Sequence, residues 1–237
     1  MIQGNNLHTY INKRTFLRLV VFFATGILAV AQPRIPDSPA LRKVVIDAGH
    51  GGEDPGAIGR TAREKDITLP IALKVGQYIT ENFNNVEVIY TRKNDTFIPL
   101  FDRADIANKN NADLFVSIHV NANPKNREAE GTETYVMGLH TDEKNFEVAK
   151  KENSVIVLEK DYSIKYEGFD PSSPESYIIF SLMQNKYLEQ SLTLAAMVQD
   201  EFREKALRCD RGVKQAGFLV LWRTSMPSIL IETGFIS

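Results

Sequence analysis

The sequence predicts an α/β domain: a mostly parallel, twisted sheet with helices on both faces. Apolar runs of strand length alternate with segments of helical periodicity from residue 43 onward, which is typical of such sheets. The first run, Val44 to Ile46, is apolar at every position, which indicates a strand buried on both faces. A chain of 237 residues that is 43% hydrophobic and 24% charged fits a single domain with an ordinary core.

The expected elements follow in chain order. Strands are predicted at residues 44–46, 86–90, 113–119, 131–137, 217–221 and 228–232. Helices are predicted at residues 67–83, 100–110 and 176–207. Residues 138–175 interrupt this rhythm with a polar, charged insert, and a stretch of that length inside a compact domain is usually functional or mobile.

The N-terminal residues differ in kind from the rest. Basic residues precede an apolar stretch at 19–30, which ends in the small-x-small pattern Ala29-Val30-Ala31. This pattern predicts a secretory signal peptide over 1–31, followed by a proline-containing linker over 32–42. An uncleaved anchor is the alternative, but the apolar stretch is shorter than the ~20 residues that span a bilayer. We therefore expect export through the inner membrane, a periplasmic location and no membrane span in the mature protein.

Charge and cysteine content argue against a nucleic-acid partner and against an internal disulfide. The formal net charge is -2, which gives no attraction to nucleic acid, so no nucleic-acid partner is expected. The chain has a single cysteine, Cys209, so no internal disulfide forms even in an oxidising compartment.

Four titratable side chains stand at or just beyond the ends of predicted strands: His50, Glu64, His119 and Glu232. In α/β sheets, ligands and catalytic groups collect outside the carboxyl ends of the strands. Two imidazoles and a carboxylate with an open fourth position make a catalytic zinc centre, and a second carboxylate serves as general acid/base. The pattern therefore predicts a metal-dependent hydrolase.

Spacing alone does not choose the carboxylate ligand. The acidic residues that follow the first histidine closely are Glu53, Asp54, Glu64 and Asp66. Glu64 starts a predicted helix, where the helix dipole stabilises a carboxylate without any metal. His119, taken alone at the end of a strand, is as often structural as functional.

Four segments resemble the zinc-dependent N-acetylmuramoyl-L-alanine amidases, in particular those of cell division. These segments are Ile46–Gly52, Glu64–Ile67, Ser117–Ala122 and Ile231–Ser237. They occur in the family's order with similar spacing, and the resemblance covers about residues 43–237.

The resemblance implies that His50, Glu64 and His119 hold one zinc ion and that Glu232 is the catalytic acid/base. The implied substrate is peptidoglycan, cleaved between the lactyl group of N-acetylmuramic acid and L-alanine during cell-wall remodelling or daughter-cell separation. Two further residues are candidate substrate contacts: Asn121, which lies beside the second histidine, and Arg103, which matches a family position.

The resemblance also gives the insert at residues 138–175 a role. In cell-division members of the family, a segment at this place is a regulatory helix that covers the zinc until an activator protein displaces it. Residues 146–158 are weakly amphipathic. Glu147, Glu152 and Glu159 are the candidate acidic side chains that would block the zinc. A solvated surface insertion is the alternative interpretation.

Two rival functions remain at this level. One is a non-catalytic peptidoglycan-binding or regulatory domain, which the presence of all four site residues disfavours. The other is a zinc peptidase that cuts within the stem peptide, which product analysis separates from an amidase. Related domains continue past the motif that carries Glu232, so a truncated C-terminus at Ser237 is also expected.

Overall fold

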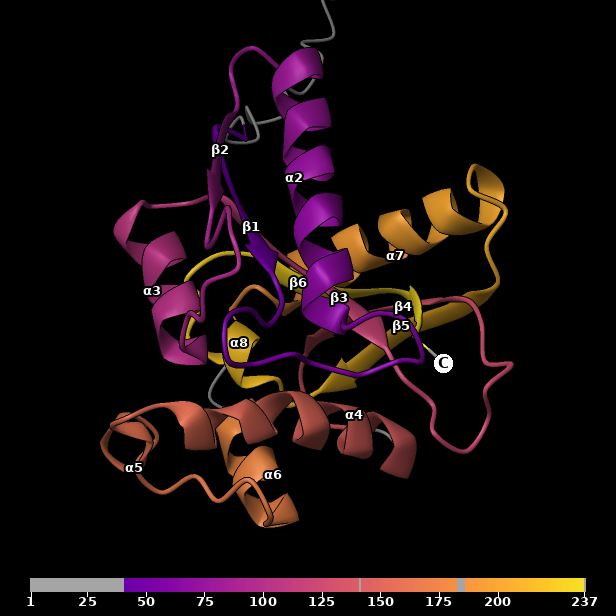
Figure 1. Cartoon of the computed structure of the whole chain (residues 1–237). Coiled ribbons are helices and arrows are strands. Elements are labelled where there is room, and N and C mark those ends of the chain that lie inside the picture. The colour runs from indigo at the N-terminus through magenta and orange to yellow at the C-terminus, as the bar shows by residue number, and fades with distance from the viewer. Residues whose placement is uncertain (1–40, 141, 183–185, 237) are drawn as a thin grey trace, which may run out of the picture. The chain divides into compact units, whose positions relative to one another are not determined.

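A six-stranded sheet with the order β2-β1-β3-β6-β4-β5 forms the centre of the domain (Figure 1). The computed structural model describes residues 41–140, 142–182 and 186–236, so the predicted signal peptide and most of the predicted linker lie outside the described residues. The strands are β1 (Lys43–Ala48), β2 (Glu87–Tyr90), β3 (Leu114–Asn121), β4 (Thr132–Met137), β5 (Asp210–Ala216) and β6 (Ser228–Phe235). Every neighbouring pair in the sheet is parallel except β4 and β6, which confirms the predicted mostly parallel sheet.

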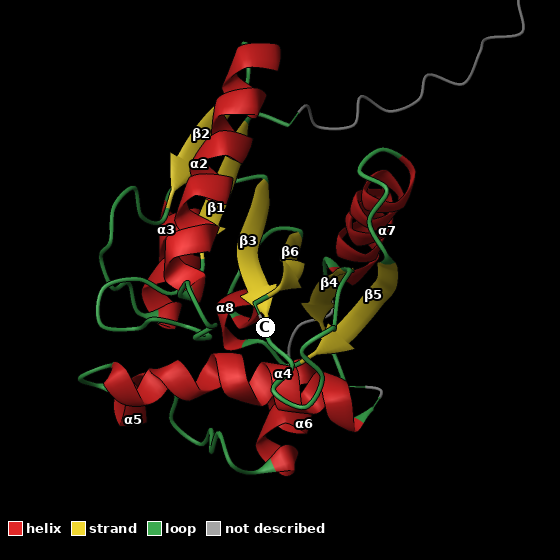
Figure 2. Ribbon diagram, turned by 45° about the vertical axis from the view of Figure 1, so that its right-hand side comes forward, coloured by secondary structure: helices red, strands yellow, loops and turns green. Residues whose placement is uncertain are grey.

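Helices cover both faces of this sheet (Figures 1 and 2). On one face, Val44 and Ile46 of β1 share a core with helices α2 (Glu64–Asn82) and α7 (Leu188–Glu204). On the other face, Val45 joins a core with helices α3 (Leu100–Lys109) and α8 (Leu219–Trp222). Successive strand side chains point to opposite faces, so one continuous apolar run feeds both cores. Among the described residues, no helix is both long and apolar enough to cross a bilayer.

The insert folds as helices that lie across the end of the sheet toward which β3 points (Figure 2). It contains α4 (Glu143–Asn153), the 3-10 helix η1 (Ser154–Leu158) and α5 (Tyr162–Lys165), and α6 (Pro174–Leu182) begins at its end. The Asp142 side chain caps α4 by accepting a hydrogen bond from the Asn145 backbone N–H. Phe146 and Ala149, three residues apart on α4, are buried in the core that contains α8.

Two predicted elements are wrong. The single helix expected over 176–207 is two helices, α6 and α7, with residues 186 and 187 in a turn. Their apolar residues serve different cores: Tyr177 of α6 packs with the insert, whereas Ala195 of α7 packs on the sheet.

The strand expected at 217–221 is also wrong, because that run contains the short helix α8 and the last edge strand is β5. A short buried apolar run has the same composition in a helix and in a strand. An edge strand such as β5 is half exposed, so it lacks the apolar run that would have revealed it.

Candidate metal centre

His50 is held on the loop after β1 in a left-handed backbone conformation, with φ of 63°. Such a conformation is strained for a residue with a side chain and persists only where the surroundings enforce it. Arg103 holds this backbone conformation in place. Its Nη2 donates to the His50 carbonyl at 2.8 Å, and its Nη1 forms a buried ion pair with Asp47 at 2.8 Å. The imidazole is oriented by Asp54, whose Oδ2 lies 2.7 Å from His50 Nδ1 and leaves Nε2 free to face the site.

Glu64 is the first residue of α2, and its side chain is fully buried. Its two oxygens accept hydrogen bonds from the backbone N–H groups of Ala57 at 2.8 Å and Val120 at 2.9 Å. The competing candidates lie elsewhere: Glu53 is exposed, and exposed Asp66 pairs with a neighbouring arginine. The tertiary structure therefore separates Glu64 from the acidic residues that spacing could not distinguish.

His119 lies near the carboxyl end of β3, next to Glu232 of β6 in the strand register. Its ring packs against the backbone of Gly49, where an added Cβ would come within 2.5 Å of the imidazole Cε1 and Nε2 atoms. A second glycine, Gly56, leaves space in the same way for His50 and Glu64. These two glycines explain why the loop after β1 can bring its backbone so close to the site.

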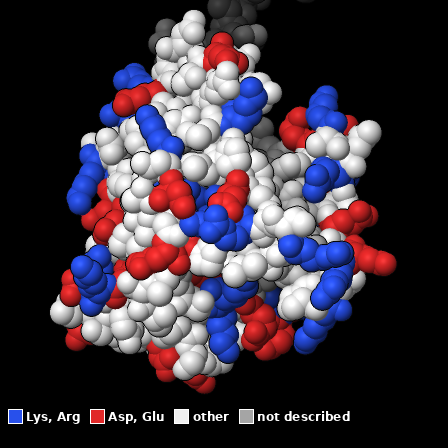
Figure 3. All heavy atoms as spheres, in the orientation of Figure 1, with Lys and Arg blue, Asp and Glu red and all other residues white. Residues whose placement is uncertain are grey.

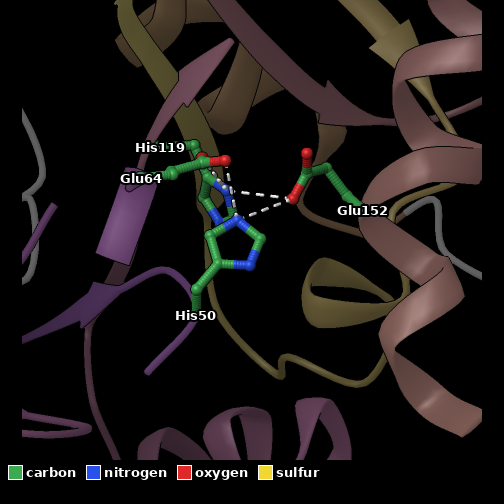
Figure 4. Close-up of side chains that lie close together, drawn as sticks. All are labelled: His50, Glu64, His119 and Glu152. Atoms are coloured by element: carbon green, nitrogen blue, oxygen red, sulfur yellow. Dashed lines mark hydrogen bonds and ion pairs between the residues drawn. The ribbon is translucent and has the colours of Figure 1, made fainter. Parts of the chain in front are cut away.

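Four side chains converge on one point at this end of the sheet (Figure 4). His50 Nε2 lies 3.1 Å from Glu64 Oε2, and His119 Nδ1 lies 3.2 Å from Glu64 Oε1. Glu152, from helix α4 of the insert, places Oε2 at 3.1 Å from His50 Nε2 and 3.2 Å from His119 Nδ1. One ligand atom from each of these four residues lies within 4.8 Å of every other, and all four residues are buried.

The charges in this cluster shift the pKa of each member. Burial lowers the pKa of His119, but the carboxylates of Glu152 and Glu64 outweigh it and raise the pKa to about 9. His50 responds in the same direction for the same reasons. Burial raises the pKa of Glu152, but Lys151 and the two histidines lower it well below its usual value. Burial and the charge of Glu152 raise the pKa of Glu64, but His50 and His119 lower it below its usual value.

The donor set fits a divalent metal ion. His50 Nε2 and Glu152 Oε2 are buried and form no hydrogen bond with the described residues, although they face each other at 3.1 Å. Imidazole nitrogen and carboxylate oxygen are ligands of zinc and similar cations, which compete with protons for the same lone pairs. The hydrogen bond between Asp54 and His50 is the usual outer support of a metal-binding imidazole.

Glu232 stands beside this cluster but is not one of its four members. Its side chain is fully buried, and neither carboxylate oxygen has a hydrogen-bond partner among the described residues. Burial, followed by the charge of Glu64, raises the pKa of Glu232 well above its usual value. A buried carboxyl group with a raised pKa next to metal-ligating side chains can accept and return a proton near neutral pH.

The two candidate substrate contacts occupy buried positions. Arg103 is 1% exposed, and its guanidinium also donates to the carbonyls of Ile98 and Ala48. In the described structure, these hydrogen bonds of Arg103 hold the loop of His50, and its role as a substrate contact stays a prediction. Asn121 is also buried, and its Oδ1 accepts a hydrogen bond from the next backbone N–H at 2.7 Å.

The three acidic side chains predicted as candidates for blocking the metal centre lie in different environments. Glu152 reaches the cluster, whereas Glu147 is exposed on the same helix. The Glu159 side chain is buried against the first residue of α3, and its Oε1 accepts a hydrogen bond from the Leu100 backbone N–H at 2.8 Å. The orienting role of Asp54 was missed from the sequence, although its position four residues after His50 is the signal that was available.

The chain is similar to several known proteins in sequence and in structure. Residues 44–237 match the family described as N-acetylmuramoyl-L-alanine amidase. The chain is 34% identical over 213 residues to the amidase AmiA of Escherichia coli K12, covering 87% of this chain and 70% of AmiA. The amidase of Clostridium difficile 630 superposes with a TM-score of 0.59 at 31% identity, over 82% of this chain and 80% of that one. AmiC2 of Nostoc punctiforme superposes with a TM-score of 0.53 at 28% identity, over 82% and 80% of the two chains. The chain therefore belongs to the N-acetylmuramoyl-L-alanine amidase family.

Proposed function

We propose that this amidase is zinc-dependent and that His50, Glu64 and His119 hold the metal, one ion per chain. It hydrolyses the amide between the lactyl group of N-acetylmuramic acid and L-alanine in peptidoglycan. The observation that carries the proposal is the convergence of these three side chains beside Glu232, which is buried without a hydrogen-bond partner among the described residues.

Each residue has a distinct role in the proposed reaction. Zinc at this place would supply Lewis-acid chemistry, polarising the amide carbonyl and making water a stronger nucleophile at neutral pH. Glu232 takes a proton from the attacking water and delivers it to the departing L-alanine nitrogen. Asp54 keeps the His50 ring in place, and Arg103 holds the strained backbone that presents this ring.

We also propose that the described conformation is autoinhibited. A catalytic zinc centre needs a coordination position open to water and substrate, and Glu152 reaches the point where the histidines and Glu64 converge. Two residues beyond Glu152 hold the insert in place. Asn153 donates to the Gly217 carbonyl at 2.7 Å and accepts from the Leu219 N–H at 2.9 Å, and Glu159 accepts from the start of α3. An activator protein that displaces α4 would uncover the centre.

The proposed setting is the periplasm, where the enzyme acts in cell-wall remodelling or daughter-cell separation. The support is the basic and then apolar pattern of residues 1–31, which is typical of a signal peptide, with residues 32–42 as a linker to the catalytic domain. Peptidoglycan is reached only after export, so the substrate and the leader pattern agree.

Digestion of purified sacculi, with and without a chelator, tests the proposed function. The chain should release peptides that begin with a free L-alanine amine, and the chelator should stop this release. Mass analysis of the products identifies the bond that is cut. Cleavage inside the stem peptide would contradict the amidase assignment, and unchanged release after complete metal removal would contradict the metal dependence.

A further inference from the structure

A second cavity, of about 440 Å³, opens beside the metal centre. Its walls come from the loop after β1, the loop after β3, helix α4 and the residue that follows β6. The lining residues that matter here are Ala57, Arg60, Asn123, Arg127, Lys151 and Ile236. The small cavity next to His50 and Glu152 has a volume of about 10 Å³, so the larger one offers far more space for a ligand.

This larger cavity, which we call the basic groove, is continuous with the metal centre through two residues. The Ala57 backbone N–H donates to Glu64 Oε2 at 2.8 Å, and Lys151 Nζ lies 3.8 Å from the same oxygen. Asn123 follows two residues after the strand that carries His119. A substrate whose amide reaches the centre would therefore have groups on one side of that amide at the mouth of this groove.

All charged residues that line the basic groove are basic. Its lining includes Arg60, Arg127 and Lys151 and contains no acidic residue among the described ones. Lys151 pairs with Glu152 at 3.0 Å, but neither arginine forms an ion pair with a described residue, and both are exposed. Figure 3 shows that basic and acidic side chains are interspersed over the face drawn there. The two unpaired guanidinium groups face a space that can hold an anionic ligand.

We propose that the basic groove is the subsite for the peptide portion of the substrate, with Arg60 and Arg127 binding its carboxylates. This inference rests on the proposed function, because the peptide that continues from L-alanine carries free carboxylate groups. A guanidinium offers a planar fork of donors that matches a carboxylate, and Ile236 gives the groove an apolar surface for the aliphatic parts of the peptide. Both arginines belong to core loops, so the subsite remains when α4 is displaced.

Titration calorimetry with two synthetic peptides tests the subsite. One is a tripeptide that begins L-Ala-D-Glu, and the other carries D-isoglutamine in place of D-glutamate, so the two differ by one carboxylate. The wild-type chain should bind the carboxylate form more tightly. The double variant Arg60→Glu, Arg127→Glu should lose about tenfold or more in affinity for that form, the effect of removing one charge-assisted hydrogen bond, and much less for the amidated form.

Lys125→Glu is the matched control, because Lys125 is exposed on the same loop as Arg127 but does not line the groove. This variant makes the same charge reversal at one position instead of two and should bind both peptides as the wild type does. Equal affinity of the double variant and the wild type for the carboxylate peptide would overturn the subsite, as would an equal loss in the control. Failure of the proposed function is a separate result, because it would appear as no release of L-alanine-terminated peptide from sacculi by the wild-type chain.

Discussion

Removing the Glu152 carboxylate should activate the enzyme without unfolding the insert. In the substitution Glu152→Ala, the contacts of Oε2 with His50 and His119 are lost, together with the pair between Oε1 and Lys151. The anchors of the insert at Asn153 and Glu159 remain. The insert should therefore stay folded but close over the centre less often.

The contacts give the size of the effect. Glu152 Oε2 contacts the two imidazoles as ion pairs at 3.1 and 3.2 Å, and a charge-assisted contact of this kind contributes about 1.5–3 kcal/mol to stability. Each 1.4 kcal/mol changes an equilibrium by about tenfold, so the open fraction should rise roughly 10- to 150-fold. Hydrolysis should rise by the same factor for as long as the closed form still predominates, because only the open form admits substrate.

The assay is the initial rate of peptide release from purified sacculi at equal protein and zinc concentrations. Glu147→Ala is the matched control, since Glu147 lies on the same helix, is exposed and is not part of the cluster. The control should keep the wild-type rate. An unchanged or lower rate for Glu152→Ala, in a protein whose circular dichroism shows it folded, would refute the autoinhibition.

Other substitutions test the remaining parts of the site. Glu232→Gln should abolish hydrolysis while zinc content, measured by elemental analysis, stays near one per chain; full turnover would contradict its role. Gly49→Ala should reduce both zinc content and activity, because the new Cβ would lie 2.5 Å from the His119 ring; a variant with normal zinc content would show that the ring can move. Asn153→Ala should raise basal hydrolysis, since both of its hydrogen bonds to the core are lost, and a wild-type rate would argue against its anchoring role. Asp47→Asn should cost about 3–5 kcal/mol at pH 7, as expected when one partner of a buried ion pair is removed. Burial raises the pKa of Asp47, but Arg103 and two hydroxyl groups lower it below its usual value. Its contribution is therefore present at neutral pH and lost as the pH falls below about 4, so urea denaturation of the variant should depend less on pH in that range than that of the wild type.

Much of the fold follows from local patterns. The apolar runs of β1, β3 and β6 end at one edge of a mostly parallel sheet, and this pattern alone predicts that His50, His119 and Glu232 lie close together. The strand prediction at residues 217–221 is wrong because four or five buried apolar residues suit a short helix as well as a strand. The division between α6 and α7 was missed because an unbroken apolar pattern does not show that its two halves pack against different cores.

The sequence by itself determined the chemistry of this protein: the residue types, their order at the strand ends and their match to an amidase family. The reason is that strand ends and glycine-rich loops are local features, and their chemistry does not depend on distant partners. The tertiary structure decided what depends on packing between segments far apart in the chain. It brought Glu64 and Asp54 into different roles around His50, buried Arg103 beneath the same loop, and selected Glu152 over Glu147 as the side chain that reaches the centre. No spacing rule decides these points, because each depends on how one element docks against another.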